Sequence, residues 1–319
     1  MRLITFVAQG RQRVGALLDE DTTVVDLTAA APDRPEFGSM LALIESGPAG
    51  LVRAAELVAA RPTTALVDPK AVRWCAPLPR PPRVRDCALF TEHLAVALRE
   101  MARRQAAAAD DPDAAFDQLI ASGRFTLHPL FAERVLYYNV DPLAISGPDD
   151  TIAPPEDATE LDYELEIAAV VGRDGRDIAP DDADGYVFGY TICNDWSARD
   201  LQLKLMQTGV GAGASKDFST TLGPCLVTAD EVPDPYALAM RARVNGEQFS
   251  LGSTASMTHT FAEAIAQFSR IGGVYAGEVI ASGTVASGTG FDAGRHLKPG
   301  DIVELEIDGI GTLRNQVSL

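Results

Sequence analysis

Two glutamates near the middle of the chain stand at a spacing that could hold a metal ion. The segment Leu161–Val171 is rich in β-branched and aromatic residues, which predicts a strand. Glu164 and Glu166 are two residues apart in it, so a strand would place both carboxylates on one face. Two like charges beside a core repel each other, and a hard divalent cation such as Mg²⁺, Mn²⁺ or Ca²⁺ would relieve that repulsion. Alternating glutamates are about equally typical of a solvated strand face, so the spacing alone leaves both interpretations open.

A third carboxylate and several polar residues follow the next apolar run. Asp195 closes the run Tyr186–Cys193 and lies in the sequence NDWSARD, where a buried strand feeds a loop. Arg199 and Gln202 follow at helical spacing and could bind an acid group. The segment GVGAGASKDFSTTLGP contains Lys216, but it has no phosphate-loop signature and no strand–helix context for a dinucleotide. Lys216 is therefore interpreted either as a fixed cation for a developing oxyanion or as a solvated loop lysine.

His93 is the histidine best placed for acid–base chemistry. It falls in the first turn of a helix predicted over Glu92–Ala107. The positive end of the helix dipole favours the neutral imidazole, which is the form that a general base needs. A histidine on an exposed helix face is about as frequent an explanation of the same position. No zinc-binding pattern is present, and a serine triad has no nucleophile elbow to support it.

The composition argues against several classes of partner. The chain has 319 residues and a formal net charge of −18, which argues against a nucleic-acid-binding surface and disfavours an anionic membrane. The N-terminal apolar run is too short for a secretory signal, and no window approaches the roughly eighteen apolar residues of a membrane span. Four cysteines without metal or redox spacing indicate reduced thiols and a cytoplasmic protein.

The elements that must position these residues fall into two regions. Residues 1–75 predict a small N-terminal α+β domain with a hairpin, a third strand and two helices. After a stiff proline-rich connection, residues 76–319 predict a β-rich domain of many short strands and few helices. Within it, residues 92–140 predict a charged, helical flap or insert with little core of its own. The fold class expected is α+β and β-rich.

Taken together, these segments resemble the fumarylacetoacetate hydrolase family over about residues 80–317. The motifs that carry the resemblance are RDxxxFxxH at 85–93, LDYELEIAAVVG at 161–172, GYTICNDWSARDLQ at 189–202, SKDFSTTLGP at 215–224, SGT at 282–284 and LKPGDIVELEIDGIGTLRNQV at 297–317. The fold that this resemblance implies is a mixed β-roll domain, usually dimeric, behind a small N-terminal domain.

The resemblance also implies roles for individual residues. The divalent-metal ligands, with Mg²⁺ expected first, would be Glu164, Glu166, Asp195 and Asp86. His93 would be the general base and Lys216 the oxyanion-stabilising lysine. The substrate contacts would be Arg199, Gln202, Thr220 and Thr284.

The acid partner of His93 is the one role without a matching position. The sequence TGFDAGRHL, near the C-terminus, offers no obvious equivalent, and the position three residues after the histidine is Val96. Glu92, or Glu100 two turns along the same helix, is therefore expected to serve as the acid.

Three functions are compatible with these residues. The first is metal-dependent hydrolysis of a carbon–carbon bond in a β-diketone or acylpyruvate-type acid, in which His93 deprotonates a water. The second is decarboxylation or keto–enol isomerisation of a 2-keto acid, which needs no attacking water and would be favoured if His93 lacked an acid partner. The third is a non-catalytic keto-acid-binding protein.

Overall fold

A 12-stranded sheet forms the centre of the computed structural model, which describes residues 1–319. The strand order along its main path is β4-β3-β2-β1-β14-β12-β11-β17-β6-β7, with β5 on β1 and β8 on β14. The strands are β1 (Arg2–Ala8), β2 (Arg11–Leu18), β3 (Thr23–Asp26), β4 (Leu66–Val67), β5 (Arg73–Cys75), β6 (Val84–Cys87), β7 (Tyr137–Val140), β8 (Ile145–Ser146), β11 (Leu165–Val171), β12 (Val187–Asp195), β14 (Thr220–Thr228) and β17 (Val279–Ala281).

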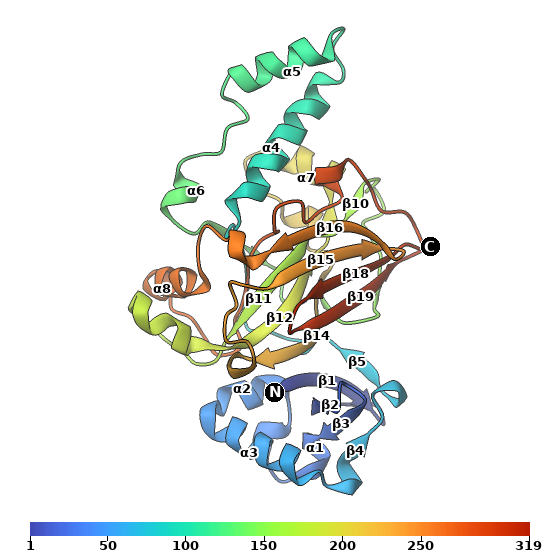
Figure 1. Ribbon diagram of the computed structural model, residues 1–319, viewed down its shortest axis with the longest axis vertical. Helices are drawn as coiled ribbons and strands as arrows, with labels where there is room; N and C mark the ends of the chain where they lie inside the picture. The colour runs from blue at the N-terminus through green and yellow to red at the C-terminus, as the bar shows by residue number, and fades with distance from the viewer.

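The N-terminal region contributes the first strands of this sheet. Its helices are α1 (Leu27–Ala30), α2 (Met40–Glu45) and α3 (Gly47–Ala60). Arg2 and Leu3 of β1 pair with Val227 and Leu226 of β14, so the backbone hydrogen bonds run on into the rest of the molecule. In Figure 1 this region forms the lower part of the molecule. A domain boundary at residue 75 stays a prediction.

A smaller sheet of five strands packs against the central one. Its order is β16 (Glu247–Ser253), β15 (Ala239–Val244), β18 (Ile302–Ile307), β19 (Gly311–Val317) and β9 (Thr151–Ile152). The turn between β15 and β16 has positive φ angles at Asn245 and Gly246, as a type I′ turn requires. The helix α8 (Phe261–Ile271) begins with a capping box between Thr260 and Glu263.

Strand β11 is buried on both of its faces. Leu165, Ile167 and Ala169 belong to the larger apolar core, whereas Ala168 and Val170 belong to a second core with the N-terminal helices. The predicted strand over 161–171 is interrupted, because Leu161–Asp162 forms a separate strand, β10, paired with β13 (Ser197–Ala198). All residues of β11 itself are buried.

Three helices project from the body between β6 and β7. They are α4 (Thr91–Ala106), α5 (Pro112–Ala121) and α6 (Leu130–Glu133), and Figure 1 shows α4 and α5 rising from one end as an antiparallel pair. None of the residues of α5 is buried. The remaining helix, α7 (Arg199–Met206), follows β13 directly.

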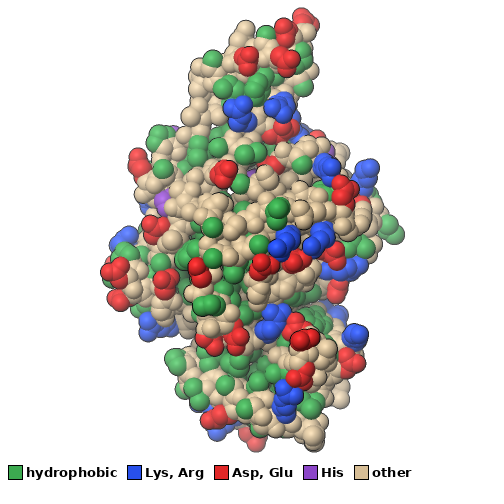
Figure 2. Space-filling model, viewed as in Figure 1, with side chains coloured by type: hydrophobic (Ala, Val, Ile, Leu, Met, Phe, Trp, Pro, Cys, Tyr) green, Lys and Arg blue, Asp and Glu red, His purple; other side chains and the backbone are tan.

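The α+β, β-rich fold class predicted from the sequence is confirmed. Figure 2 shows acidic and basic side chains interspersed over the visible face, without a continuous basic area. No helix combines the length and the apolar composition needed to cross a membrane.

Candidate metal centre and active site

Four carboxylates that come from three parts of the central sheet converge at one point inside the molecule. Asp86 comes from β6, Glu166 from β11, Glu164 from the position directly before β11, and Asp195 from the end of β12. One oxygen of each lies within 4.8 Å of the others, and all four residues are buried. The predicted pair on one strand face is thus part of a four-carboxylate cluster.

Two oxygens in this cluster have no partner in the protein. Asp86 Oδ1 and Glu166 Oε2 are buried without a hydrogen bond. Burial and the neighbouring acids raise the pKa of both carboxyl groups well above their ordinary values. Unpaired buried oxygens are costly, and a divalent cation with oxygen ligands would satisfy them. The donor set therefore fits a hard divalent metal such as Mg²⁺.

Lys216 offsets part of the negative charge of the cluster. Its Nζ donates to Glu164 Oε2 at 2.7 Å and also to Asp195. Burial alone would raise the pKa of Glu164, but Lys216 and Arg199 hold that pKa below its ordinary value. The Lys216 side chain is only 3% exposed, which excludes the solvated loop lysine as its explanation.

Hydroxyl groups complete the surroundings of the cluster. Tyr138 donates to Asp195, and Thr220 Oγ1 donates to Asp195 Oδ1 at 3.2 Å. Thr284 Oγ1 lies 3.4 Å from Glu166 Oε1. These contacts fix the rotamers of two of the four carboxylates.

Arg199 is enclosed by acidic and polar groups of the protein itself. Its Nη1 contacts Glu164 Oε1 at 2.7 Å and Gln202 Oε1 at 3.0 Å, and its Nε donates to Asp162 Oδ2 at 2.9 Å. Asp162 also accepts the backbone N–H groups of Gly290 and Phe291, at 2.8 and 3.0 Å. Arg199 and Asp162 thus connect a metal-cluster glutamate to the loop at 290–291.

The residue that follows this loop, Asp292, is the acid partner of His93. Asp292 Oδ2 lies 3.0 Å from His93 Nδ1, and both side chains are at least 90% buried. The expected partner, Glu92, is exposed on α4, and Glu100 instead faces Arg104, with 3.4 Å between Oε1 and Nε. The expectation that Glu92 or Glu100 pairs with His93 is therefore wrong. Adjacent residues on a helix point in different directions, which keeps Glu92 away from its neighbour.

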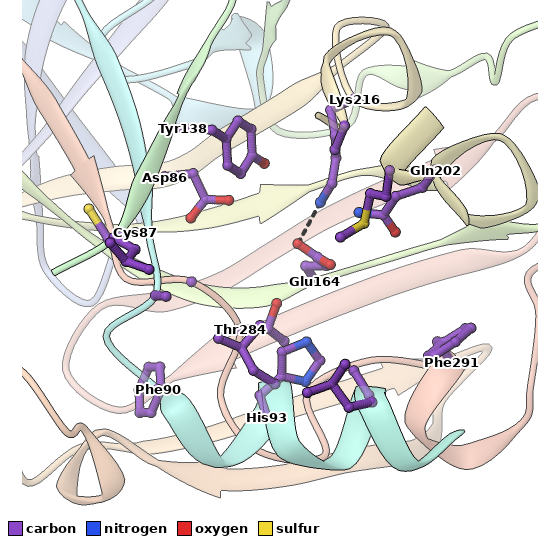
Figure 3. A pocket seen from close by; sticks show the side chains of 18 of the residues that line it. Asp86, Cys87, Phe90, His93, Tyr138, Glu164, Gln202, Lys216, Thr284 and Phe291 are labelled. Atoms are coloured by element: carbon purple, nitrogen blue, oxygen red, sulfur yellow. Dashed lines mark hydrogen bonds and ion pairs between the residues drawn. The ribbon is translucent and has the colours of Figure 1, made fainter. Parts of the chain in front are cut away.

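These groups surround one cavity of about 470 Å³. In Figure 3, His93 and Thr284 lie on one side and point toward Glu164, while Lys216, Asp86 and Tyr138 lie on the other. The predicted site residues that line the cavity are His93, Lys216, Arg199, Gln202, Thr284, Asp86, Glu164 and Glu166. Asp195 and Thr220 contact each other behind this lining, and Glu92 is not part of it.

Three residues of the site were missed from the sequence. Asp292 is the only acid in TGFDAGRHL, which was the one available signal for it. Tyr138 and Asp162 had no signal, because each acts through a contact with a residue that is distant in the chain.

Comparison with known proteins identifies relatives of this chain. The family model described as "Fumarylacetoacetate (FAA) hydrolase C-terminal" matches residues 119–318. The oxaloacetate tautomerase YisK of Bacillus subtilis is 32% identical over 329 aligned positions, which cover 99% of this chain and 100% of that protein. The mitochondrial oxaloacetate tautomerase fahd2 of Xenopus laevis is 37% identical over 183 residues, 57% of each protein.

A solved structure gives the same result over the full length. The fumarylacetoacetate hydrolase of Exiguobacterium antarcticum superimposes with a TM-score of 0.73 at 28% identity, covering 100% of this chain and 99% of the other. The motifs, the fold and the full-length relative agree, and this chain belongs to the fumarylacetoacetate hydrolase family.

Proposed function

We propose that this enzyme interconverts the keto and enol forms of a 2-keto acid with the help of a divalent metal. The observation that carries the proposal is the position of His93, which contacts the buried Asp292 and lies on one wall of the cavity, facing the carboxylate cluster on the other. The full-length similarity to an oxaloacetate tautomerase supports the same reaction.

The metal would be held by Asp86, Glu164, Glu166 and Asp195. When bound, a divalent cation supplies Lewis-acid charge that favours the enolate form of a 2-keto acid. Lys216 keeps two of the four carboxylates in place through its contacts with Glu164 and Asp195.

The proton transfer would be carried out by His93. With Asp292 accepting a hydrogen bond from Nδ1–H, the other ring nitrogen, Nε2, is left without a proton and can act as the base. Nε2 takes a proton from the carbon next to the keto group and returns it to the enolate oxygen. One C–H bond breaks and one O–H bond forms, so the carbon skeleton is unchanged.

The charged groups favour this reaction over hydrolysis. Hydrolysis of a ketone creates a tetrahedral oxyanion, which needs a free donor. The two basic side chains that line the cavity, Lys216 and Arg199, are both paired with acids of the protein. Keto–enol interconversion has no tetrahedral intermediate and does not need a further cation.

Hydrolysis of a carbon–carbon bond remains the second candidate, and one observation favours it. His93 has a buried acid partner in Asp292, as a base that activates water requires. In that reaction His93 would deprotonate a water, and the water would attack the distal carbonyl of a diketo acid. Decarboxylation is the third candidate, and it requires neither the base nor the water.

The three reactions differ in their products. The test supplies oxaloacetate and acetylpyruvate to the Mg²⁺-loaded protein and follows the enol absorbance together with pyruvate, acetate and CO₂. We expect faster decay of the enol absorbance with both carbon skeletons intact, and loss of that acceleration in His93→Gln. Formation of pyruvate and acetate from acetylpyruvate would identify a hydrolase, and release of CO₂ from oxaloacetate above the Mg²⁺ background a decarboxylase.

A further inference from the structure

The cavity has two chemically different halves. The polar half holds the carboxylate cluster, Lys216 and His93, whereas the other half is formed largely by α4. Leu94, Ala97, Leu98 and Met101 all line the cavity, and their spacing of i, i+3, i+4 and i+7 makes them one face of that helix. This apolar face begins one residue after His93, so it continues directly from the proposed catalytic base.

Two further segments extend the apolar lining. Leu127, Phe131 and Leu136 come from the segment around α6, and Leu203 comes from α7. In all, 16 of the 25 residues that line the cavity are hydrophobic. Apolar side chains from three separate elements therefore converge on one space, which indicates a binding surface for an apolar group.

The size of the cavity exceeds what a four-carbon acid needs. Its volume of about 470 Å³ lies in the range of roughly 300–1,000 Å³ that is typical of pockets for drug-sized ligands. A four-carbon keto acid at the carboxylate cluster would leave the apolar half unfilled.

The apolar half also lacks a cation for a second carboxylate. The arginines of α4 point elsewhere: Arg99 and Arg103 lie over the ring of Phe116, and Arg104 Nη1 donates to Glu160 at 2.7 Å. A distal carboxylate would therefore lie against leucine and methionine side chains, where burying an unpaired charge is costly.

We propose that the preferred substrate is a 2-keto monocarboxylic acid with an extended alkyl or aryl chain, not a four-carbon dicarboxylic acid. The keto acid group occupies the metal half, and the apolar chain lies along Leu94, Leu98 and Met101. This inference rests on the proposed function for the position of the keto acid group, and it adds the class of substituent that the enzyme selects.

The test measures equilibrium binding, because binding is independent of turnover. The full-length protein with Mg²⁺ is titrated calorimetrically with straight-chain 2-oxo acids from 2-oxobutanoate to 2-oxooctanoate, and with oxaloacetate. Burial of one methylene group changes an affinity about threefold to fourfold, so Kd should fall by about that factor for each added carbon. Oxaloacetate should bind more weakly than 2-oxohexanoate. A Kd that does not change with chain length, or tighter binding of oxaloacetate, would overturn the proposal.

A matched pair of variants locates the chain-binding surface. Leu98→Gln should weaken the binding of 2-oxooctanoate about tenfold and leave 2-oxobutanoate within a factor of about two. Ala95→Gln, on the exposed face of the same helix, should leave both affinities unchanged. Equal weakening of the short and the long acid by Leu98→Gln would contradict the assignment of this face to the chain.

Failure of this inference differs from failure of the proposed function. If no keto acid is tautomerised but Kd still falls with chain length, the reaction is wrong and the substrate class stands. If oxaloacetate is tautomerised rapidly and Kd is independent of chain length, the reaction stands and the substrate class is wrong.

Discussion

The two halves of the cavity are built by different kinds of structure. The carboxylates of the metal half lie on strands of the 12-stranded sheet or directly beside one, and each of these residues is at most 6% exposed. The apolar half depends on α4, of whose sixteen residues only His93, Ala102 and Ala106 are buried. A rigid sheet suits groups that must hold a metal in fixed geometry, whereas an insert can change its side chains without disturbing that geometry. The sheet thus carries the carboxylates of the proposed metal site, whereas the insert supplies both the proposed base, His93, and much of the apolar lining.

The largest effect is expected from a change in the carboxylate cluster. Glu166→Gln should lower kcat/KM about 10⁴-fold, because it removes a metal ligand and with it several kcal/mol of charge stabilisation. Steady-state kinetics on the Mg²⁺-loaded protein checks this. Glu56→Gln, the same substitution at an exposed position of α3, is the control and should match the unmodified protein. Near-normal activity of Glu166→Gln would show that the carboxylate cluster does not take part in the reaction.

The next effect concerns the histidine that α4 contributes. His93→Gln should lower kcat about 10²-fold to 10³-fold through loss of the general base. Asp292→Asn should lower kcat in the same direction, because Asp292 fixes the ring by its contact with Nδ1. Glu92→Gln should have no effect, since Glu92 is exposed. A strong loss of kcat in Glu92→Gln, together with a normal kcat in Asp292→Asn, would identify Glu92 as the acid partner of His93.

A substitution of Arg199 tests whether this side chain stabilises the fold or binds the substrate. Arg199→Gln removes the partner of the buried Asp162 and should lower the free energy of unfolding by about 3–5 kcal/mol. Urea denaturation measures this, with Lys204→Gln, at an exposed position of the same helix, as the control. Unchanged stability together with a raised KM would instead identify Arg199 as the substrate anchor that the family resemblance implies.

The smallest effect is a dependence of thermal stability on pH and metal. In the metal-free protein, burial raises the pKa of Asp86, Glu166 and Asp195 in the folded state, whereas unfolded carboxyls titrate near about pH 4. Folding therefore binds protons, and the stability from these groups is fully present below about pH 4 and is lost as the pH rises through the raised pKa values.

A divalent cation bound to these carboxylates would replace the protons. Excess Mg²⁺ should raise Tm by about 5 °C at pH 8 and by less at pH 5, as differential scanning calorimetry can measure. An equal gain at both pH values would contradict the coupling.

The carboxylate cluster could largely be predicted from the sequence. Glu164 and Glu166 at a two-residue spacing, next to an apolar run, are local features, and a strand converts that spacing into a shared face. The placement of Asp86 beside them rested on the family resemblance, because nothing in the local sequence shows that β6 lies two strands away from β11.

The surroundings of α4 could not be predicted in the same way. His93 and Asp292 are 199 positions apart, and only the folded chain brings the loop at 290–291 onto Asp162 and hence Asp292 onto the histidine. Glu92 was chosen because it is close in sequence, although neighbours on a helix do not face each other. The apolar face of α4 was present in the sequence as the series 94, 97, 98 and 101, but what it faces follows only from the fold.

The four buried carboxylates are proposed to form one divalent-metal site. Titration of the metal-free protein with Mn²⁺, followed by the loss of the free-ion electron paramagnetic resonance signal, tests this directly. The expected result is one bound ion per chain, displaced by Mg²⁺ and lost in Glu166→Gln but not in Glu56→Gln. Absence of binding to the unmodified protein, or equal binding to Glu166→Gln, would contradict the claim.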